Sequence, residues 1–392
     1  MENLKKYIEE NNISNSHELA DKLLEELGIK CRKEDDANGN TLFTFKYDQI
    51  NSPKSSPIVM ECRGIVLDEA MNVAFKGFDR FYNYGEMEEI TSQFNWEDFD
   101  AFEKADGSLV KLYCYDGLWQ VGTSGTATAN VPFNATSWNT GGEVQTFREK
   151  ILDAFGYTSE EEFQRDASSA FEDNLNYAFE YTSNENRIVT PYEYPEMVLL
   201  AAFKDGVEID NRSLDEEYGD MRVDALNVRK ADVYKVSCKN DLLKLVDNLL
   251  GLQEGAVVRD SNGMRLKIKS SLYVAAHRMR GENGLTVRNA CKLVLAGEHE
   301  EYLTYFPDDS HKLRLVDNAL TSYIELIQNE YDTKYSDIQE QKEFALRLVE
   351  KAFPYNNILF KMRKNGNTAH YTFHSLSENN KLTTLEKLIT ND

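Results

Sequence analysis

The sequence lacks the features that define several common protein classes. Its five cysteines are widely spaced and form no CxxC pair, which argues against a disulfide framework or a zinc site and indicates reduced thiols. No apolar run approaches the ~20 residues needed to cross a bilayer. The polar, acidic start MENLKKYIEENN is unlike a secretory signal. We therefore expect a cytoplasmic protein without a membrane partner, acting in the host cytoplasm if the chain is viral.

Two enzyme motifs are also missing. The chain contains no GxxxxGK(S/T) run, so it has no phosphate-binding P-loop. A histidine pattern of the phosphoesterase kind occurs once, at 370–374, whereas such enzymes need two separated copies. The six histidines are therefore interpreted as ordinary surface or core residues.

Positive charge is scarce, with 44 Lys and Arg against 67 Asp and Glu and a net charge of −23. A protein that coats nucleic acid would be basic, because Lys and Arg supply most of the non-specific affinity for phosphates. An enzyme that holds nucleic-acid ends in a local basic cleft is still compatible with this charge. Residues 257–292 carry eight basic residues against two acids, although solvated helix or strand faces would look the same.

The hydrophobic pattern predicts two regions. Residues 1–27 are expected to be helical, with a cap at Ser16, and CRKEDDANGN (31–40) is expected to be a polar connector. Asp116-Gly117 predicts a tight hairpin. Short strand-like runs dominate from Thr41 to about Lys269: TLFTFKY, PIVMECRGIVL, VAFKGF, LVKLYCY, LWQVG, LNYAFEYT, MVLLAAF, EGAVV and MRLKIK.

Helical spacing interrupts these runs and then replaces them. Helices are expected over 144–155, 159–168 and 241–250, and after Tyr273 over 285–297, 312–330 and 336–353. The predicted fold class is therefore α+β, with antiparallel sheets and flanking helices in a catalytic domain (1–275) and an all-helical C-terminal domain (276–392).

A lysine stands directly before a predicted turn in the run KADGSL, residues 104–109. The glycine lets a ligand approach the backbone, and the Ser108 hydroxyl can bind a phosphate or a ribose. The Lys104 amine becomes a nucleophile when burial and neighbouring cations lower its pKa. An ordinary solvated turn gives the same pattern, so the run by itself leaves both interpretations open.

Further charged residues lie in apolar strands. Arg63 has the planar guanidinium that suits a phosphate, or it is an edge-strand charge. Glu180 stands between two aromatic residues, so strand alternation points it away from both rings. Glu180 is either solvent-facing or available to a ribose hydroxyl or a metal. Glu254 begins an apolar strand, where an ordinary strand-start charge is the simpler interpretation.

The run RLKIK, residues 265–269, alternates basic and apolar residues. A period of two places Arg265, Lys267 and Lys269 on one face of a strand. That face is either the solvated side of a half-buried strand or the wall of a polyphosphate pocket.

The order of these patterns is more specific than any one of them. Arg-Gly, Lys-x-Asp-Gly-Ser, Phe-Glu, Glu-Gly and Lys-x-Lys follow one another along the chain. In this order the chain resembles the covalent nucleotidyltransferase superfamily of ligases and capping enzymes, and more closely the RNA ligase 1 family of bacteriophages. The resemblance covers residues 41–273 and rests on these runs: ECRGI (61–65), RFYN (80–83), KADGSL (104–109), NRIV (186–189) and KIK (267–269), followed by Tyr273.

The resemblance implies a role for each matched position. Lys104 would be the nucleophile that attacks the α-phosphorus of ATP. Glu254 and Glu300 would serve the metal, and Tyr273 matches a position that the family needs for activity. The remaining matched residues would bind the nucleotide: Tyr47, Arg63, Arg80, Glu180, Glu254, Lys267 and Lys269.

The same resemblance implies the reaction. The chain would join RNA 5′-phosphate and 3′-hydroxyl ends through a lysyl-AMP intermediate, using ATP and Mg²⁺, for which Mn²⁺ substitutes. The implied process is RNA repair, with tRNA as a candidate substrate, the helical domain as a source of RNA specificity and a monomer as the expected state. Three alternatives stay open: an mRNA-capping guanylyltransferase, a DNA ligase, and an inactive RNA-binding relative. The first two would normally append a small β-barrel where this chain is helical.

The chain departs from the family at two places. The strand after the hairpin reads VGTSG (121–125), where the phage relatives carry lysines. Losing those charges changes the expected triphosphate contacts but leaves the nucleophile in place. Arg80 stands where the family has a lysine, which keeps the charge and alters the hydrogen-bond geometry.

Overall fold

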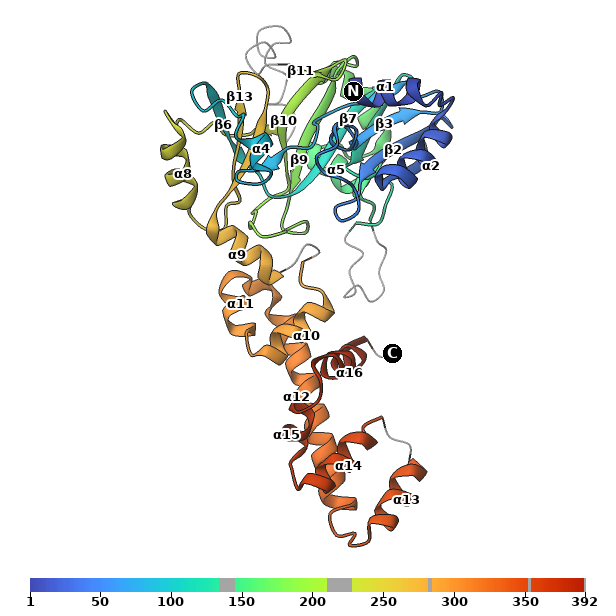
Figure 1. The fold of residues 1–392 in the computed structure, drawn as a ribbon, viewed down its shortest axis with the longest axis vertical. Coiled ribbons are helices and arrows are strands. Elements are labelled where there is room, and N and C mark those ends of the chain that lie inside the picture. The colour runs from blue at the N-terminus through green and yellow to red at the C-terminus, as the bar shows by residue number, and fades with distance from the viewer. Residues whose placement is uncertain (134–144, 210–227, 281–283, 352–353, 391–392) are drawn as a thin grey trace. The chain divides into compact units, whose positions relative to one another are not determined.

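The chain divides into two compact units, the first ending at His277 and the second continuing from Arg278. In Figure 1 the strands precede α9 in the chain, and the part after it is helical. The computed structural model describes residues 1–133, 145–209, 228–280, 284–351 and 354–390.

A four-stranded sheet covered by helices opens the first unit. Its order is β1-β2-β3-β4, and α1 and α2 bury Leu4, Leu19 and Leu23 against Phe43 and Phe45. The elements are α1 (Glu2–Glu10), α2 (Ser16–Leu27), β1 (Ile29–Asp35), β2 (Thr41–Tyr47), α3 (Pro57–Glu61), β3 (Arg63–Asp68) and β4 (Val73–Phe75).

The prediction of one helix over residues 1–27 with a cap at Ser16 is wrong in its details. The chain breaks after α1, where Asn12 takes a positive φ of 53°. The cap of α2 is Asn15, whose side chain accepts a hydrogen bond from the N–H of Glu18 at 3.0 Å. Ser16 instead donates from its hydroxyl to the carbonyl oxygen of Asp68 at 2.5 Å.

Two other segments near β2 were also predicted wrongly. The first half of the supposed connector 31–40 pairs with β2, with Cys31 opposite Phe45, because a paired edge strand tolerates a polar face. Pro57–Glu61, predicted as strand, forms α3, since proline suits the first turn of a helix. Glu61 then accepts hydrogen bonds from the N–H groups at the start of α1, those of Asn3 and Leu4.

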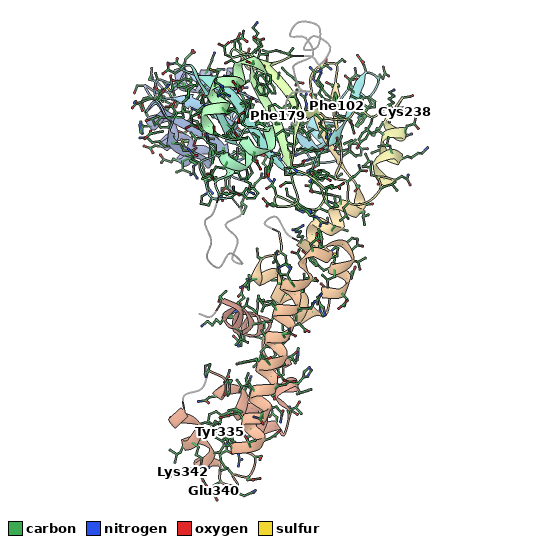
Figure 2. All side chains as sticks on the ribbon, turned by 180° about the vertical axis from the view of Figure 1, so that it is seen from behind. Phe102, Phe179, Cys238, Tyr335, Glu340 and Lys342 are labelled. Atoms are coloured by element: carbon green, nitrogen blue, oxygen red, sulfur yellow. The ribbon has the colours of Figure 1, made fainter. Side chains whose placement is uncertain are left out.

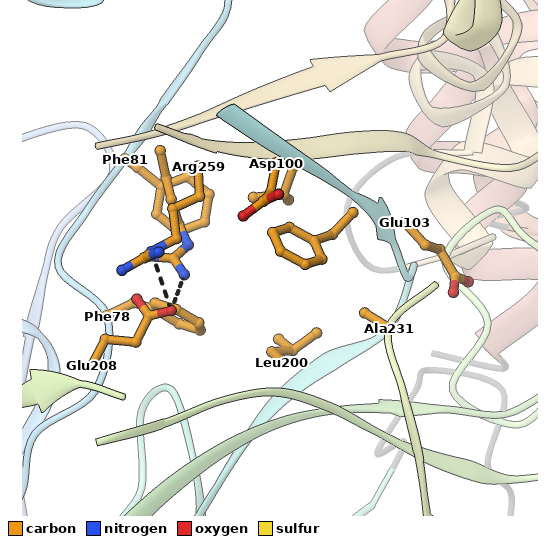
Figure 3. Close-up of a pocket in the computed structure, with 11 residues that line it drawn as sticks. Phe78, Phe81, Asp100, Glu103, Leu200, Glu208, Ala231 and Arg259 are labelled. Atoms are coloured by element: carbon orange, nitrogen blue, oxygen red, sulfur yellow. Dashed lines mark hydrogen bonds and ion pairs between the residues drawn. The ribbon is translucent and has the colours of Figure 1, made fainter. Parts of the chain in front are cut away.

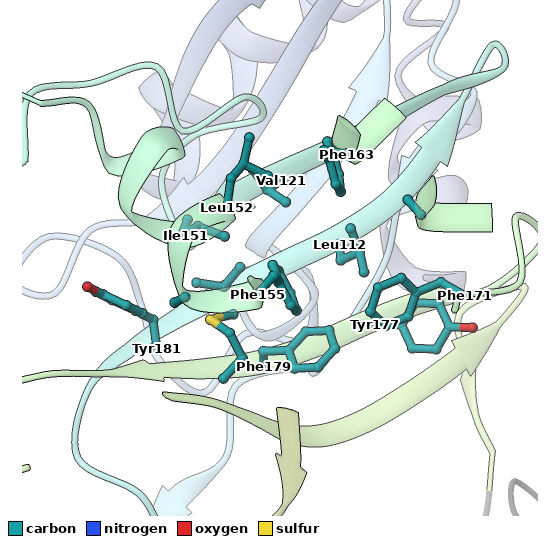
Figure 4. Packing of buried hydrophobic residues seen from close by; sticks show 14 of the residues in the cluster. Leu112, Val121, Ile151, Leu152, Phe155, Phe163, Phe171, Tyr177, Phe179 and Tyr181 are labelled. Carbon is teal, nitrogen blue, oxygen red and sulfur yellow. The ribbon is translucent and has the colours of Figure 1, made fainter. Parts of the chain in front are cut away.

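The second sheet has the order β11-β10-β9-β7-β8, with β12 paired to β10. One face packs against α5 and α6, where the rings of Phe155 and Phe179 lie 5.1 Å apart (Figure 4). The Asp116-Gly117 hairpin is confirmed, with positive φ at both residues. The elements are β7 (Ser108–Tyr115), β8 (Leu118–Thr123), α5 (Phe147–Phe155), α6 (Glu160–Asp166), β9 (Asn176–Thr182), β10 (Glu196–Lys204), β11 (Val207–Glu208) and β12 (Val228–Lys230).

The third sheet has the order β5-β14-β13-β6. Leu242 and Val246 of α8 cover one of its faces, against Val258 and Leu266. Pairing is mostly antiparallel, as predicted, with parallel pairs at β10–β12 and β14–β5. The elements are β5 (Tyr82–Asn83), α4 (Glu88–Thr91), β6 (Phe99–Lys104), α8 (Lys239–Asp247), β13 (Gly255–Asp260) and β14 (Arg265–Lys269).

The second unit is helical in its described residues, as predicted. Tyr323 and Tyr335 are buried among its helices, and Figure 2 labels Tyr335 with other side chains of this unit. Across the described ranges, every helix is too short or too polar to cross a membrane. The helices are α9 (Ser271–Arg280), which spans the boundary, and then α10 (Val287–Ala296), α11 (His299–Tyr305), α12 (Ser310–Lys334), α13 (Gln341–Lys351), α14 (Asn356–Asn365), α15 (Ala369–His374) and α16 (Glu378–Thr390).

Candidate active site

Lys104 stands where the chain passes from one sheet to another. It is the last residue of β6 in the third sheet, and Ser108 begins β7 in the second. Gly107 lies between them, where an added Cβ would be 2.1 Å from the carbonyl oxygen of Tyr181. Only glycine allows this approach, so the Lys-x-Asp-Gly run fixes the crossing and the place of the lysine.

A buried carboxylate anchors this crossing. Asp106 Oδ1 accepts a hydrogen bond from the Tyr273 hydroxyl at 2.7 Å. Its Oδ2 accepts from the N–H groups of Val189 and Thr190, at 2.8 and 2.7 Å. The side chain thereby ties the crossing to the 186–189 run and to α9. The sequence identified these segments but not Asp106 as their link, because only the fold brings them together.

Lys104 shares a carboxylate with a second lysine. Its Nζ lies 2.7 Å from Glu254 Oε2, and Lys269 Nζ lies 2.8 Å from Glu254 Oε1. Glu254 is only 4% exposed. Burial acts to raise the pKa of Glu254, but the two ammonium groups outweigh it and hold the pKa below its ordinary value.

The expectation that the pKa of Lys104 is lowered is wrong for the free protein. Burial does act to lower this pKa, but the carboxylates of Glu254 and Glu180 outweigh it and raise the pKa above its ordinary value. The side chain is therefore an ammonium ion before substrate binds. It must lose a proton before it can act as a nucleophile.

Glu180 lies on the opposite side of the crossing, on β9. As predicted, it points away from Phe179 and Tyr181, which are both in the core. Its Oε1 accepts a hydrogen bond from the N–H of Gly107 at 3.1 Å. Burial raises the pKa of Glu180 to about 7, and the negative charges of Glu254 and Asp106 act in the same direction, against Lys104.

The raised pKa of Glu180 should make folding stability depend on pH. A carboxyl group with a folded-state pKa of about 7, against an ordinary 4.5, binds its proton more tightly in the folded state. The stability that Glu180 contributes to the folded state is fully present below about pH 4.5 and is lost as the pH rises through about 7. Urea unfolding of wild type and Glu180→Gln at several pH values should therefore show a flatter profile for the variant. Equal pH dependence of the two proteins would contradict the assignment.

Three rows of residues cross the third sheet on its open face. The first row contains Lys104 and Lys269, both opposite Gly255. The second contains Phe102 and Lys267, both opposite Val257, and the third contains Asp100 and Arg265, both opposite Arg259. The alternation predicted for 265–269 is confirmed, since Leu266 and Ile268 are buried on the other face.

Most residues of the second and third rows line a cavity that is partly open to solvent (Figure 3). They are Asp100, Phe102, Val257, Arg259 and Arg265. At its charged end Glu208 pairs with Arg265 and with Arg259, the latter at 3.5 Å. Residues 265–269 were interpreted from the sequence as a pocket wall or a solvated face, and Arg265 does line this cavity; the other lining residues were not predicted to lie together. Its lining is formed by Phe78, Phe81, Asp100, Phe102, Glu103, Leu200, Glu208, Ala231, Val257, Arg259 and Arg265.

The cavity has further cations beside it. The guanidinium of Arg63 lies 4.6 Å from the centre of the Phe81 ring, and Lys267 Nζ lies 5.2 Å from the same centre. Burial, followed by the charges of Arg63 and Lys104, lowers the pKa of Lys267 to about 7. These groups are arranged to receive an anion.

Arg80 and Tyr47 complete the predicted nucleotide set. Arg80 is buried, stacks on Tyr82 at 4.2 Å and pairs with Glu86 at 2.7 Å. Its Nη1 is buried without a hydrogen-bond partner among the described residues. The Tyr47 ring centre lies 5.9 Å from the Arg80 guanidinium.

Glu300, the second predicted metal ligand, lies outside this group. It is on α11 of the second unit, with a side chain that is 85% exposed and 3.8 Å from His299. Its role stays a prediction. The other predicted residues all lie in the first unit.

Comparisons with known proteins show what the chain is similar to. A baculovirus protein named as a bifunctional polynucleotide kinase/RNA ligase (Autographa californica nuclear polyhedrosis virus) is 31% identical over 283 residues, which is 68% of this chain and 38% of that protein. The RNA ligase of Rhodothermus phage RM378 is 24% identical over 412 residues, covering 88% of this chain and 89% of that one. Among solved structures, an archaeal ATP-dependent RNA ligase gives a TM-score of 0.42 at 15% identity, covering 88% of this chain and 82% of that chain.

A sequence profile of a whole family also matches. Its description is RNA ligase, and it covers residues 61–273, more than half of the 392-residue chain. The matched range begins at the Arg63 run, contains the crossing at Lys104 and its partners on β9, β13 and β14, and ends at Tyr273. By this match the chain belongs to the RNA ligase family.

Proposed function

We propose that this chain is an ATP-dependent RNA ligase in which Lys104 forms a covalent adduct with AMP. One observation carries the proposal. Lys104 lies at the junction of two sheets, beside a buried carboxylate and a group of cations, in the same sheet as the lining of a cavity. Such a junction would bring an amine, a nucleotide and an RNA end together.

The cavity would hold the nucleobase. Phe102 and Leu200 offer apolar surfaces for a planar ring, while polar groups at the far end can read its edge. Glu180, beside Lys104, would accept a hydrogen bond from a ribose hydroxyl. The phosphates would lie toward Lys267, Arg63 and Arg80, since arginine and lysine are the side chains that bind such oxygens.

The chemistry consists of three displacements at phosphorus. The proton leaves the Lys104 ammonium, for which Glu254 Oε2 is the neighbouring acceptor, and the amine attacks the α-phosphorus as the bond to pyrophosphate breaks. An RNA 5′-phosphate oxygen then attacks the same phosphorus, and the N–P bond to Lys104 breaks. Finally a 3′-hydroxyl loses its proton and attacks the activated 5′-phosphorus, and AMP leaves. Cations that bind phosphate oxygens favour every step by positioning and electrostatics.

The residues present fit a magnesium ion. Mg²⁺ prefers oxygen ligands and is usually held by one or two carboxylates together with substrate phosphates. Glu254 and Glu180 supply such oxygens. Within the described ranges no group of three or more His, Cys, Asp or Glu is suited to a metal, so the substrate phosphates would supply the remaining ligands. A bound Mg²⁺, or Mn²⁺ in its place, supplies positive charge to the phosphate oxygens. A Naegleria gruberi RNA ligase has been solved with ATP and Mn.

The finer assignments belong to the same proposal. Residues 1–275 would carry the adenylyl transfer, and residues 276–392, including Glu300, would contribute RNA selectivity. A tRNA with a broken loop is the proposed substrate in the cell, with a monomer in the host cytoplasm as the working state. The separation of the chain into two compact units supports this division, because the matched site residues other than Glu300 all belong to the first unit.

Labelled nucleotide tests the proposal directly. Incubation with ATP labelled at the α-phosphate, together with Mg²⁺, should label the protein at Lys104, as mapped by mass spectrometry. RNA with 5′-phosphate and 3′-hydroxyl ends should discharge the label and be sealed, whereas nicked DNA should not. Labelling by GTP would favour a capping enzyme instead, and the absence of any adduct would favour an inactive relative.

A further inference from the structure

Lys46 is a cation near the candidate site that has no role in the proposed reaction as described above. It lies next to the end of β2, opposite Arg63 at the start of β3, where the register between the strands shifts. Like charges placed opposite each other on neighbouring strands are destabilising. The pair therefore indicates a function rather than a contribution to stability.

Lys46 is held in place by a neutral group. Its Nζ lies 2.9 Å from Ser124 Oγ, just beyond the end of β8. The side chain is half-buried, and burial followed by the charge of Arg63 holds its pKa below the ordinary value. Within the described part of the chain, Lys46 forms no ion pair with a carboxylate.

Arg63 is likewise half-buried and has no carboxylate partner among the described residues. It donates to the backbone oxygen of Asp79 at 3.2 Å and stacks on Phe81. Lys104, Lys269 and Arg80, in contrast, are each paired with an acid. Half-buried charges without counter-ions are costly unless an anion arrives to neutralise them.

The backbone around Lys46 is closely packed, so the ammonium position is defined. An added Cβ at Gly64 would lie 2.7 Å from the carbonyl oxygen of Ser124, and Lys111 Nζ donates to the carbonyl oxygen of Gly64 at 3.0 Å. These contacts place the start of β3, at Arg63 and Gly64, directly against the end of β8. Lys46 and Arg63 thus flank one point beside Ser124.

The end of β8 has no charge of its own at this point, since residues 121–125 read VGTSG. Lys46 of β2 therefore supplies the ammonium group beside Ser124.

We propose that Lys46 binds substrate phosphate oxygens together with Arg63. This inference depends on the proposed ligase activity. The phosphate belongs either to the polyphosphate of ATP or to the 5′ end of the RNA. Separate assays of the two reaction steps distinguish these sources. A contact with ATP affects the labelling of Lys104, and a contact with RNA affects the transfer of AMP from the labelled protein.

The test removes the positive charge at Lys46 and then places a lysine at position 124, next to the end of β8. Lys46→Ser should lower either the rate of labelling or the rate of AMP transfer by about tenfold to a hundredfold, as expected for the loss of one charge-assisted hydrogen bond. An increased KM for ATP would accompany the first outcome. Lys46→Ser combined with Ser124→Lys should recover most of the loss. Lys33→Ser, an exposed lysine on the adjacent strand β1, is the matched control and should behave as wild type.

Further variants separate charge from structure. Lys46→Gln keeps a hydrogen-bond donor for Ser124 without the charge and should be as impaired as Lys46→Ser, while Ser124→Ala keeps the charge and should be affected little. Urea midpoints equal to wild type would show intact folding. Full activity of Lys46→Gln in both steps, or a double variant no better than Lys46→Ser, would overturn the inference. Failure of wild type to form any AMP adduct would instead overturn the proposed function.

Discussion

Replacing Lys104 with alanine should abolish labelling of the protein by α-labelled ATP, a loss of at least about 10³-fold from the removal of a nucleophile that acts as a unit with its site. The two neighbouring lysines of the third sheet lie at other positions. Lys269 shares Glu254 but lies on β14, one strand beyond β13 from Lys104, and Lys267 is a row further along the sheet. Mass spectrometry of the intact protein measures the adduct.

Lys104→Arg is the sharper comparison. The guanidinium keeps the positive charge beside Glu254, so the carboxylate is not left buried and unpaired, but it cannot lose its proton. The arginine variant should therefore fold like wild type and still form no adduct. Sealing of RNA supplied with a ready-made 5′ adenylate should persist in this variant, because that step does not need the amine as a nucleophile. An adduct in either variant would show that the nucleophile is elsewhere.

Asp106→Ala should be the most destabilising single change at the site. It would leave the Tyr273 hydroxyl and the N–H groups of Val189 and Thr190 buried without their acceptor. Each unsatisfied donor costs about 1–3 kcal/mol, so a loss of about 3 kcal/mol or more in the free energy of unfolding is expected. Urea denaturation measures it, and the rate of labelling should fall as well, because the crossing that places Lys104 loses its anchor.

Asp106→Asn distinguishes this anchor from a general need for negative charge. The amide oxygen can still accept from the two N–H groups, and the amide NH₂ can donate to the Tyr273 oxygen, since a hydroxyl both donates and accepts. We expect this variant to retain most of its stability. Adding Tyr273→Phe removes that acceptor and should destabilise Asp106→Asn less than it does wild type, in which the lost hydrogen bond is made to a buried carboxylate. Equal destabilisation in the two backgrounds would contradict the proposed link.

The strands and the candidate residues could largely be predicted from the sequence, because alternation and motif spacing are local. The predicted face of RLKIK and the orientation of Glu180 are both confirmed, and each follows from a period of two. Pro57–Glu61 was mistaken for a strand because a short apolar run has no period long enough to distinguish helix from strand. The polar β1 was missed because its stability comes from pairing with β2.

Properties that depend on distant contacts could not be predicted. The raised pKa of Lys104 results from carboxylates that lie 76 and 150 positions away in the chain, and nothing near Lys104 in the sequence indicates them. Lys46 at Ser124 is a similar case, with 78 positions between the two residues. The cavity is formed between sheets, so its lining comes from six or more separate segments of the chain.

The strand that ends in Lys104 finds its hydrogen-bonded neighbour, β13, only after Glu254, 150 positions later. While the polypeptide is being made on a ribosome, β6 therefore has no strand to pair with until β13 has been synthesised. At ordinary synthesis speeds this interval lasts roughly 8–30 s. By the proposed function, Lys104 would react with ATP only after the matching strands have emerged.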